Sequence, residues 1–402
     1  MRERFLYLID NNTGFLMSAP LAKPSLSQTT SRRKTFLRWL AVLALIYLLL
    51  VGIGVISRGF RAAVGDEAEQ LFAFAENPFL GLVVGILSTA LVQSSSATTS
   101  IIVGLVAGGL PVRIAIPMIM GSNIGTSITN GIASLGFVGS KEDFKQAFAA
   151  STVLDLFNLI AVLIFFPLEI LFHPLERLST ATASLFLGDR DLSMDEFDLV
   201  GAMTRPGRDL IRSATGFLPE PFNGIVQILI GIGLVFAAVY LMGKLLKQLM
   251  VGRAKDILHT ALGRGPIAGI LAGIFVTILV QSSSATTSLM IPLAGSGVFG
   301  LDVIYPFTLG ANIGTTVTSL LAATAVTGEK ALPALEIAKV HLFFNLLGVL
   351  LIFGIPFLRR LPVVGAERLG AAASENKLIA LVYLIGVFFV IPLILLGLSI
   401  VL

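Results

Sequence analysis

The ten-residue sequence LVQSSSATTS occurs twice in this chain, at Leu91–Ser100 and again at Leu279–Ser288. Each copy places one amide and a run of hydroxyl side chains inside a strongly apolar region. A helix broken at such a point exposes N–H groups that can bind an anion and carbonyl groups that can bind a cation. No His, Lys or carboxylate lies nearby in the sequence to activate a hydroxyl, so we expect a binding site and not an enzyme. The alternative is that these Ser and Thr residues only let membrane helices pack closely.

A second polar motif follows each copy of the first. GSNIGTSIT spans Gly121–Thr129, and GANIGTTVT spans Gly310–Thr318. The glycines permit an unwound turn, and Asn and Thr supply oxygen ligands of the hard kind that suits Na⁺. The motif lacks the Gly-Lys-Ser/Thr ending of a nucleotide-binding loop, so we do not expect ATP binding. Close helix packing by the glycines is the alternative interpretation.

Asp155 lies in the otherwise apolar stretch STVLDLFNLI. An ionisable group inside a membrane helix indicates a functional site by default, and both Na⁺ and a proton suit a carboxylate there. Hydrogen bonding to a neighbouring Asn or Thr is the alternative. His173, His259 and His341 are too scattered to indicate a metal cluster, so Na⁺ is the only metal that we expect.

The composition is that of a helical integral membrane protein. Of 402 residues, 55% are hydrophobic and only 13% are charged, against about 25% charged in soluble domains. The absence of cysteine excludes disulfides and thiolate metal sites. The net charge of +4 comes largely from Lys and Arg residues in loops, as the orientation of a membrane protein requires, so no nucleic acid partner is expected. Apolar runs predict helices, some of them interrupted, at about 36–57, 78–108, 112–138, 144–171, 222–244, 266–297, 303–326, 335–357 and 377–400.

The chain reads as a duplication. Both polar motifs recur in the same order and at an almost constant separation, as does a third pair, LFN at Leu156–Asn158 and FFN at Phe343–Asn345. If each QSSS region enters and leaves on one side, each half crosses the membrane three times, so the second half is inverted. Basic residues before the first helix predict that the N-terminus is cytoplasmic. The protein itself is expected in the cell membrane. The predicted organisation is a cytoplasmic tail (1–35), repeat one (36–172, hairpin 78–108), an extracytoplasmic loop (173–221), repeat two (222–358, hairpin 266–297), and a cytoplasmic loop with a terminal helix (359–402).

Paired QSSS motifs, each followed by G-[SA]-N-I-G-T and then by an F-N helix, resemble the type II sodium-dependent phosphate cotransporter family. The resemblance covers about 78–170 and 266–350. It implies an all-α membrane protein of two inverted repeats, each with a re-entrant QSSS hairpin and a broken helix. It further implies Na⁺-coupled uptake of inorganic phosphate by alternating access, with Na⁺ as the coupling ion and no cofactor.

The resemblance also assigns residues. It implies phosphate binding by the six serines of the two motifs: Ser94, Ser95, Ser96, Ser282, Ser283 and Ser284. It implies Na⁺ binding by Gln281, Ser282, Thr315 and Thr318, by their repeat equivalents Gln93, Ser94, Thr126 and Thr129, and by Asp155. Four asparagines take supporting roles: Asn123, Asn158, Asn312 and Asn345.

The sequence leaves several questions open. Hydroxyl groups do not separate phosphate from another oxyanion, and an exporter or an anion channel or membrane sensor remains an alternative to a symporter. Electrogenic animal members carry a DAPD stretch that Gly188–Asp198 does not clearly reproduce, and Asp191 is only a loose equivalent. We therefore expect two coupling Na⁺ ions and little current. The oligomeric state, monomer or homodimer, is not specified.

Overall fold

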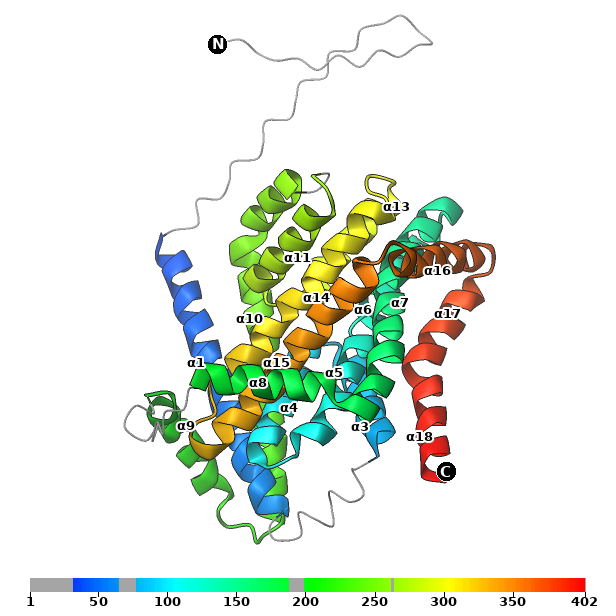
Figure 1. Cartoon of the computed structure of the whole chain (residues 1–402). Coiled ribbons are helices and arrows are strands. Elements are labelled where there is room, and N and C mark those ends of the chain that lie inside the picture. The colour runs from blue at the N-terminus through cyan, green and yellow to red at the C-terminus, as the bar shows by residue number, and fades with distance from the viewer. Residues whose placement is uncertain (1–31, 65–76, 188–198, 262–263, 402) are drawn as a thin grey trace, which may run out of the picture. The chain divides into compact units, whose positions relative to one another are not determined.

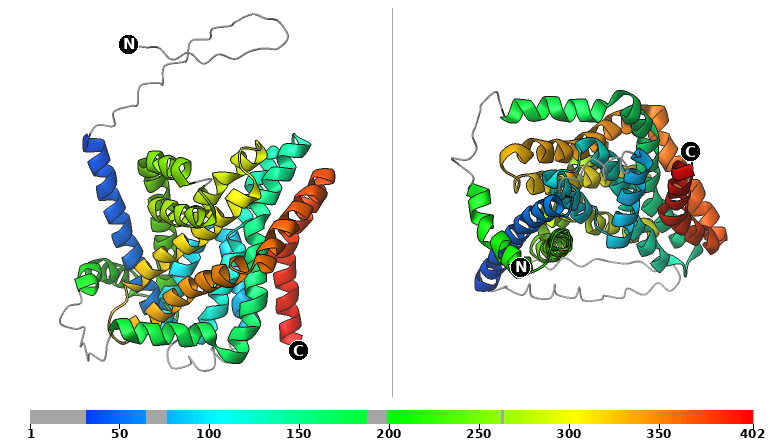
Figure 2. Two further views of the ribbon diagram at one scale, coloured as in Figure 1. Left: turned by 45° about the horizontal axis from the view of Figure 1, so that its top comes forward. Right: turned by 90° about the horizontal axis from the view of Figure 1, so that it is seen from below.

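The computed structural model describes residues 32–64, 77–187, 199–261 and 264–401. The chain divides into two units, Met1–Leu40 and Ala41–Leu402. In the first unit the described residues are the beginning of helix α1 (Arg32–Val64). Most of the expected tail and all of Gly188–Asp198, with Asp191, lie outside the described residues. The described residues contain helices and turns but no strand (Figures 1 and 2).

Five helices in the described part of the chain are long and apolar enough to cross a membrane. Exposed apolar side chains cover their outer faces, and Leu163 on α7 is 76% exposed. The spans are Lys34–Val64 in α1, Lys141–Phe172 in α7, Phe222–Leu249 in α10 (Phe222–Ala261), Gly328–Phe353 in α15 (Ala331–Gly348) with its flanking turns, and Lys377–Ser399 in α17 (Lys377–Ile385) and α18 (Ile391–Val401).

Shorter helices lie between these spans and carry the polar motifs. In the first half they are α3 (Pro78–Val92), α4 (Ser95–Gly108), α5 (Val112–Gly125), α6 (Ile128–Ser134) and the 3₁₀ turn Leu135–Phe137. In the second half they are α11 (Pro266–Val280), α12 (Ser283–Ser288), α13 (Met290–Gly295), α14 (Leu301–Ala323) and the 3₁₀ turn Gly328–Lys330. Five-residue π-helical turns, Val349–Phe353 and Gly386–Val390, follow α15 and α17.

Helix α7 (Lys141–Phe172) shows how local sequence sets the ends of these elements. The Ser140 hydroxyl accepts a hydrogen bond from the Asp143 N–H, and acidic residues occupy the first turn, where the helix dipole favours them. The helix ends at His173, which has a left-handed backbone conformation, and Pro174 then begins α8 (Pro174–Leu187). Figures 1 and 2 show α8 running across the end of the bundle at which α7 ends, whereas α16 (Pro356–Glu375) lies at the other end.

The structure differs from two of the expected elements, one broken helix and one loop. The first half is interrupted after Gly125 as expected, but α14 runs without a break from Leu301 to Ala323. Thr316 donates to the Ile313 carbonyl within this continuous helix, whereas the corresponding Ser127 hydroxyl makes no such bond. In addition, the predicted loop 173–221 contains two helices, α8 and α9 (Leu199–Thr215).

Close glycine contacts join the helices within each half. Helix α3 packs along α5, and α11 packs along α14. A Cβ atom added at Gly121 would overlap the Leu82 carbonyl oxygen, and one added at Gly310 would overlap the Ile270 carbonyl oxygen. Small residues of this kind let membrane helices approach to backbone contact. Both glycines belong to the motifs Gly121–Thr129 and Gly310–Thr318, hereafter the IGT motifs. They therefore have the packing role that was the alternative interpretation of these motifs.

Gly310→Ala should destabilise the protein by about 1–3 kcal/mol, because the added methyl group forces α11 and α14 apart. Gly233→Ala is the matched control, since a Cβ atom on this α10 glycine meets nothing within 4 Å. Thermal unfolding of the purified protein in detergent measures the difference. Equal midpoints for the two variants would contradict the contact.

Candidate functional site

The two QSSS stretches adopt the same backbone geometry. Gln93 and Gln281 end α3 and α11 in the left-handed region, with φ of 55° and 52°. The next residues are extended and cap the following helices, because the Ser94 hydroxyl accepts from the Ala97 N–H and the Ser282 hydroxyl accepts from the Ala285 N–H, both at 3.2 Å. Left-handed backbone is uncommon for non-glycine residues and clusters at functional sites.

Both stretches line one cavity of about 520 Å³. Residues far apart in the sequence thus present hydroxyls, amides and the N-terminus of α4 to the same space. The Ser95 and Ser283 side chains are buried at its wall. Hydroxyl donors and the first-turn N–H groups that the Ser94 cap does not use together suit an anion. The lining residues from the two motifs are Gln93, Ser94, Ser95, Ser96, Gln281, Ser282, Ser283 and Ser284.

The same cavity is lined by Lys244 and Lys247 of α10, which sequence reasoning missed. The sequence predicted a helix that ends near residue 244. That end is wrong, because α10 continues as helix to Ala261. The available signal was the spacing of the two lysines, which places both on one helical face. Two ammonium groups at the wall raise the local concentration of an anion.

Replacing both lysines, Lys244→Gln with Lys247→Gln, should weaken the binding of an oxyanion in this cavity about 3- to 10-fold, and more strongly at low ionic strength. Lys377→Gln is the control, because Lys377 is exposed and does not line the cavity. Equilibrium binding of ³²P-phosphate, as the probe anion, at two salt concentrations measures the effect. An unchanged phosphate dependence at low salt would contradict it.

The predicted cation ligands divide into two groups. Thr318 contacts the cavity wall, since its hydroxyl donates to Gln281 Oε1 at 3.0 Å. Thr126, Thr129 and Thr315 are not among the residues that line the cavity. The Thr126 and Thr315 hydroxyls donate to carbonyls of their own helices, at 2.9 Å and 3.0 Å. The buried Thr129 hydroxyl has no hydrogen-bond partner among the described residues.

Asp155 is buried in α7, with 1% of its surface exposed. The Tyr383 hydroxyl of α17 donates to its Oδ2 at 3.4 Å, the Ser127 side chain lies beside the same carboxylate, and Oδ1 makes no well-aligned hydrogen bond in the described structure. A buried carboxylate with an open oxygen requires a bound cation or proton to compensate its charge. Tyr383 was not found from the sequence, because the terminal helix has no counterpart in the other half.

Three of the four predicted asparagines, Asn123, Asn158 and Asn312, form a hydrogen-bonded connection between the two halves. The Asn158 amide donates to the Asn123 carbonyl oxygen, and the Asn312 amide donates to Asn158 Oδ1, both at 2.9 Å. The Asn345 amide donates to the His341 carbonyl, and its own side-chain oxygen has no partner among the described residues. Asn158 therefore connects the two IGT motifs directly.

Further hydrogen bonds join each QSSS stretch to the opposite half. The Thr287 and Ser288 hydroxyls donate to Asn130 Oδ1 at 3.0 Å and 3.1 Å. In the reciprocal position, the Ser319 hydroxyl donates to the Thr99 hydroxyl at 3.0 Å, and it also lies 2.8 Å from His341 Nδ1. Asn130 and Ser319 were missed, although each follows its IGT motif at the same distance in the sequence.

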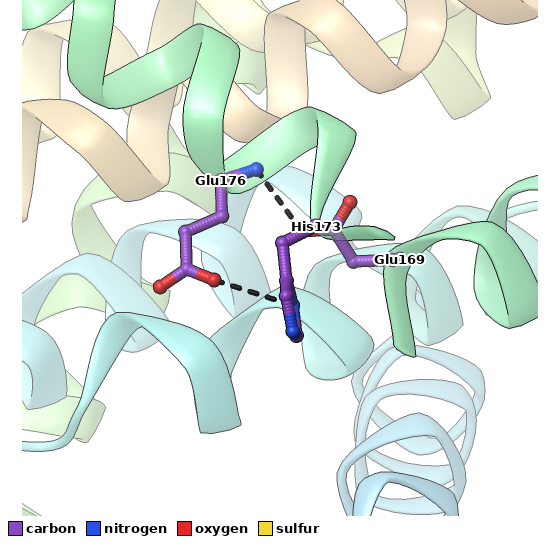
Figure 3. A group of neighbouring side chains, drawn as sticks. All are labelled: Glu169, His173 and Glu176. Carbon is purple, nitrogen blue, oxygen red and sulfur yellow. Dashed lines mark hydrogen bonds and ion pairs between the residues drawn. The ribbon is translucent and has the colours of Figure 1, made fainter. Parts of the chain in front are cut away.

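His173 lies beside two glutamates at the corner between α7 and α8, which the sequence did not predict. Ligand atoms of Glu169, His173 and Glu176 lie within 4.8 Å of one another (Figure 3). The Glu169 carboxylate, however, accepts the Leu175 and Glu176 N–H groups at 2.8 Å and 3.0 Å, and so caps α8. His173 lies 2.7 Å from Arg113 and 3.4 Å from Glu176. These bonds fix the corner between α7 and α8.

Two segments of the chain match a known protein family. Residues 48–188 and 234–366 match the Na⁺/Pi-cotransporter family. The chain belongs to this family. Each matched segment contains one QSSS stretch and one IGT motif, so the match includes both sides of the shared cavity.

Relatives of this Na⁺/Pi-cotransporter chain include animal transport proteins. Sodium-dependent phosphate transport protein 2A of Ovis aries is 34% identical, over 94% of this chain and 70% of that protein. Sodium-dependent phosphate transport protein 2B of Homo sapiens is 32% identical, over 90% of this chain and 65% of that protein. No solved structure matches the chain significantly.

Proposed function

We propose that this protein is a symporter that uses the Na⁺ gradient to take up inorganic phosphate by alternating access. The observation that carries the proposal is the single cavity lined by both QSSS stretches and two lysines. Phosphate would accept hydrogen bonds from the serine hydroxyls and from N–H groups at the start of α4, while Lys244 and Lys247 attract it. The names of the relatives favour phosphate over another oxyanion.

The arrangement of the halves supports two inverted repeats with re-entrant hairpins. Helices α3 and α11 begin at opposite ends of the second unit (Figure 1) and both end at a left-handed glutamine beside the shared cavity. The reciprocal bonds Thr287–Asn130 and Ser319–Thr99 are those expected of a pseudo-two-fold axis. Such a site can be exposed alternately by rocking one half against the other. We further propose a cytoplasmic N-terminus.

The proposal of Na⁺ coupling rests on side-chain oxygen atoms that could coordinate the cation. Gln281 and Thr318 are already in contact, and Asp155 is buried and offers an open carboxylate oxygen, although it does not line the cavity. A bound cation would offset the charge of the anion and so make its binding favourable. Phosphate binding and Na⁺ binding should therefore be mutually dependent.

Uptake into proteoliposomes tests this function. Purified protein should accumulate ³²P-phosphate above the external concentration when an inward Na⁺ gradient is imposed, and an equal K⁺ gradient should not support accumulation. Sulfate in excess should compete weakly, because the site is proposed to select phosphate. Equal uptake with either cation would exclude Na⁺ coupling, and passive equilibration alone would indicate a channel.

Thr318→Val should raise the Na⁺ concentration for half-maximal uptake about fivefold, because the variant keeps the shape of the side chain but removes an oxygen worth about 1 kcal/mol. Thr308→Val is the control on the same helix, since the Thr308 hydroxyl bonds only to the Tyr305 carbonyl of its own helix. Both variants are compared in the Na⁺ dependence of the initial rate. Equal curves would exclude Thr318 as a cation ligand.

A further inference from the structure

A second, larger cavity of about 910 Å³ lies where α11, α14 and α16 begin. It shares no lining residue with the QSSS cavity. Three cationic side chains, Lys145, Arg359 and Arg360, face two acidic ones, Asp302 and Glu367. The proposed transport cycle gives this cavity no role.

Arg359 and Arg360 are the two cations of this cavity that form no ion pair within the described residues, so they can bind an anionic ligand. Lys145 pairs with Glu142 at 3.4 Å, whereas no carboxylate of the described residues lies within ion-pair distance of Arg359 or Arg360. Asp302 occupies the first turn of α14, where the helix dipole stabilises its charge. Arginine binds phosphate groups through its planar set of N–H donors.

Tyr305 supplies a buried hydroxyl at the wall of the same cavity. The residue is 2% exposed, and its hydroxyl has no hydrogen-bond partner in the described part of the chain. Its ring packs edge-on against Phe353 and Phe157, and the Arg359 guanidinium lies 5.3 Å from the centre of the Phe353 ring. The buried donor and the guanidinium are therefore held by one aromatic cluster. An unsatisfied buried hydroxyl is costly unless a ligand accepts its hydrogen bond.

Helix termini add further donors. Helices α11 and α14 begin after Gly265 and Gly300, and neither N-terminus has a side-chain cap. In the first half the corresponding α3 is capped by Asn77, whose side chain accepts from the Phe79 N–H at 2.9 Å. The N-terminus of α5, which corresponds to that of α14, also lacks a side-chain cap, so the two halves differ in this respect only at α3 and α11.

The first half contains an equivalent cavity of about 440 Å³ with different chemistry. Pro78, Pro117 and Phe166 line it, and their counterparts in the duplication line the larger one: Pro266, Pro306 and Phe353. The counterpart of Tyr305 is Ile116, and Arg113 is already engaged with His173 at 2.7 Å. The anion-binding features are therefore particular to the second half.

We propose that the larger cavity is a second oxyanion site, which binds a doubly charged phosphate group through Arg359, Arg360 and the Tyr305 hydroxyl. The ligand is free inorganic phosphate or the phosphomonoester head group of a lipid. The sequence predicts that the segment beginning at residue 359 is cytoplasmic, so free phosphate bound by Arg359 and Arg360 would be on the side to which transport delivers it. The site itself does not depend on the proposed transport function.

Equilibrium binding of ³²P-phosphate to the purified full-length chain tests the site, in a Ser95→Ala and Ser283→Ala background that removes binding at the QSSS cavity. Binding should persist in this background, weaken tenfold or more in Arg359→Gln with Arg360→Gln, and weaken several-fold in Tyr305→Phe. Arg368→Gln on the same helix is the control, because Arg368 is exposed and does not line the cavity. Tyr305→Phe and Arg360→Lys keep the test decisive if the double arginine variant does not fold.

A second arm distinguishes the source of the phosphate group. Nanodiscs of phosphatidylcholine with and without phosphatidic acid are compared by the amount of phosphatidic acid retained by each variant. Retention that is lost with the arginines, without free-phosphate binding, assigns the site to the lipid head group. If neither phosphate nor phosphatidic acid responds to any of these variants, the second site is wrong. Na⁺-dependent uptake, measured separately in the chain with intact serines, tests the transport proposal independently.

Discussion

Ser95→Ala combined with Ser283→Ala should weaken Na⁺-dependent phosphate uptake by about 100-fold or more. Each hydroxyl faces the shared cavity from a different half of the chain. A hydrogen bond to a charged group is worth about 1.5–3 kcal/mol, which corresponds to about 10- to 100-fold in affinity for each serine. The expected change is in the phosphate concentration for half-maximal uptake.

The same change should leave the fold intact, because neither hydroxyl is one of those that cap α4 and α12. Ser94→Ala is an informative comparison, since it removes the N-cap of α4 and should lower thermal stability by about 1 kcal/mol. A double variant with normal uptake would show that the serines do not bind the anion. A double variant that unfolds would instead assign them a structural role.

Asp155→Asn should raise the Na⁺ concentration for half-maximal uptake by more than about 100-fold. The substitution keeps the shape of the side chain and an oxygen for the Tyr383 hydroxyl, but it removes the charge. Loss of one member of a buried ion pair costs about 3–5 kcal/mol, and here the proposed second member is the transported cation. The Na⁺ dependence of ³²P-phosphate uptake measures the change.

Two comparisons make the Asp155 result interpretable. Tyr383→Phe keeps the carboxylate and should shift Na⁺ activation only slightly. Thermal stability of Asp155→Asn without Na⁺ should equal or exceed that of the natural chain, because a neutral amide costs less to bury than a carboxylate. If Na⁺ activation is unchanged and the pH dependence of uptake disappears, Asp155 carries a proton and not Na⁺.

The duplicated motifs indicated where the backbone breaks and which side chains line one cavity. A repeated polar sequence in an apolar chain has few structural solutions, because broken backbone is tolerated in a membrane only where it is buried in protein or lines a cavity. Gln93 and Gln281 accordingly end their helices, and their serines line one cavity. The helical fold also follows from composition, since its long apolar runs can satisfy their backbone groups only as helices.

What the sequence did not predict depends on tertiary contacts. Lys244 has the same residue type as a loop lysine, and only the continuation of α10 places it at the cavity. The IGT motifs are nearly identical in sequence, yet one is interrupted and the other is helical throughout. The contact between Asp155 and Tyr383 joins a repeat to a helix that has no counterpart, so the duplication carried no information about it.

Thiol protection tests most directly whether one phosphate site is built from both halves. The natural chain has no cysteine, so Val92→Cys and Ala285→Cys place single thiols on the cavity wall, one in each half, without removing a hydroxyl. Phosphate with Na⁺ should slow their reaction with a charged methanethiosulfonate reagent, and the same phosphate concentration should give half-protection at both positions. Ser213→Cys, on the exposed face of α9, should react at the same rate with or without phosphate. Protection at only one of the two wall positions, or protection that does not need Na⁺, would contradict the shared, Na⁺-coupled site.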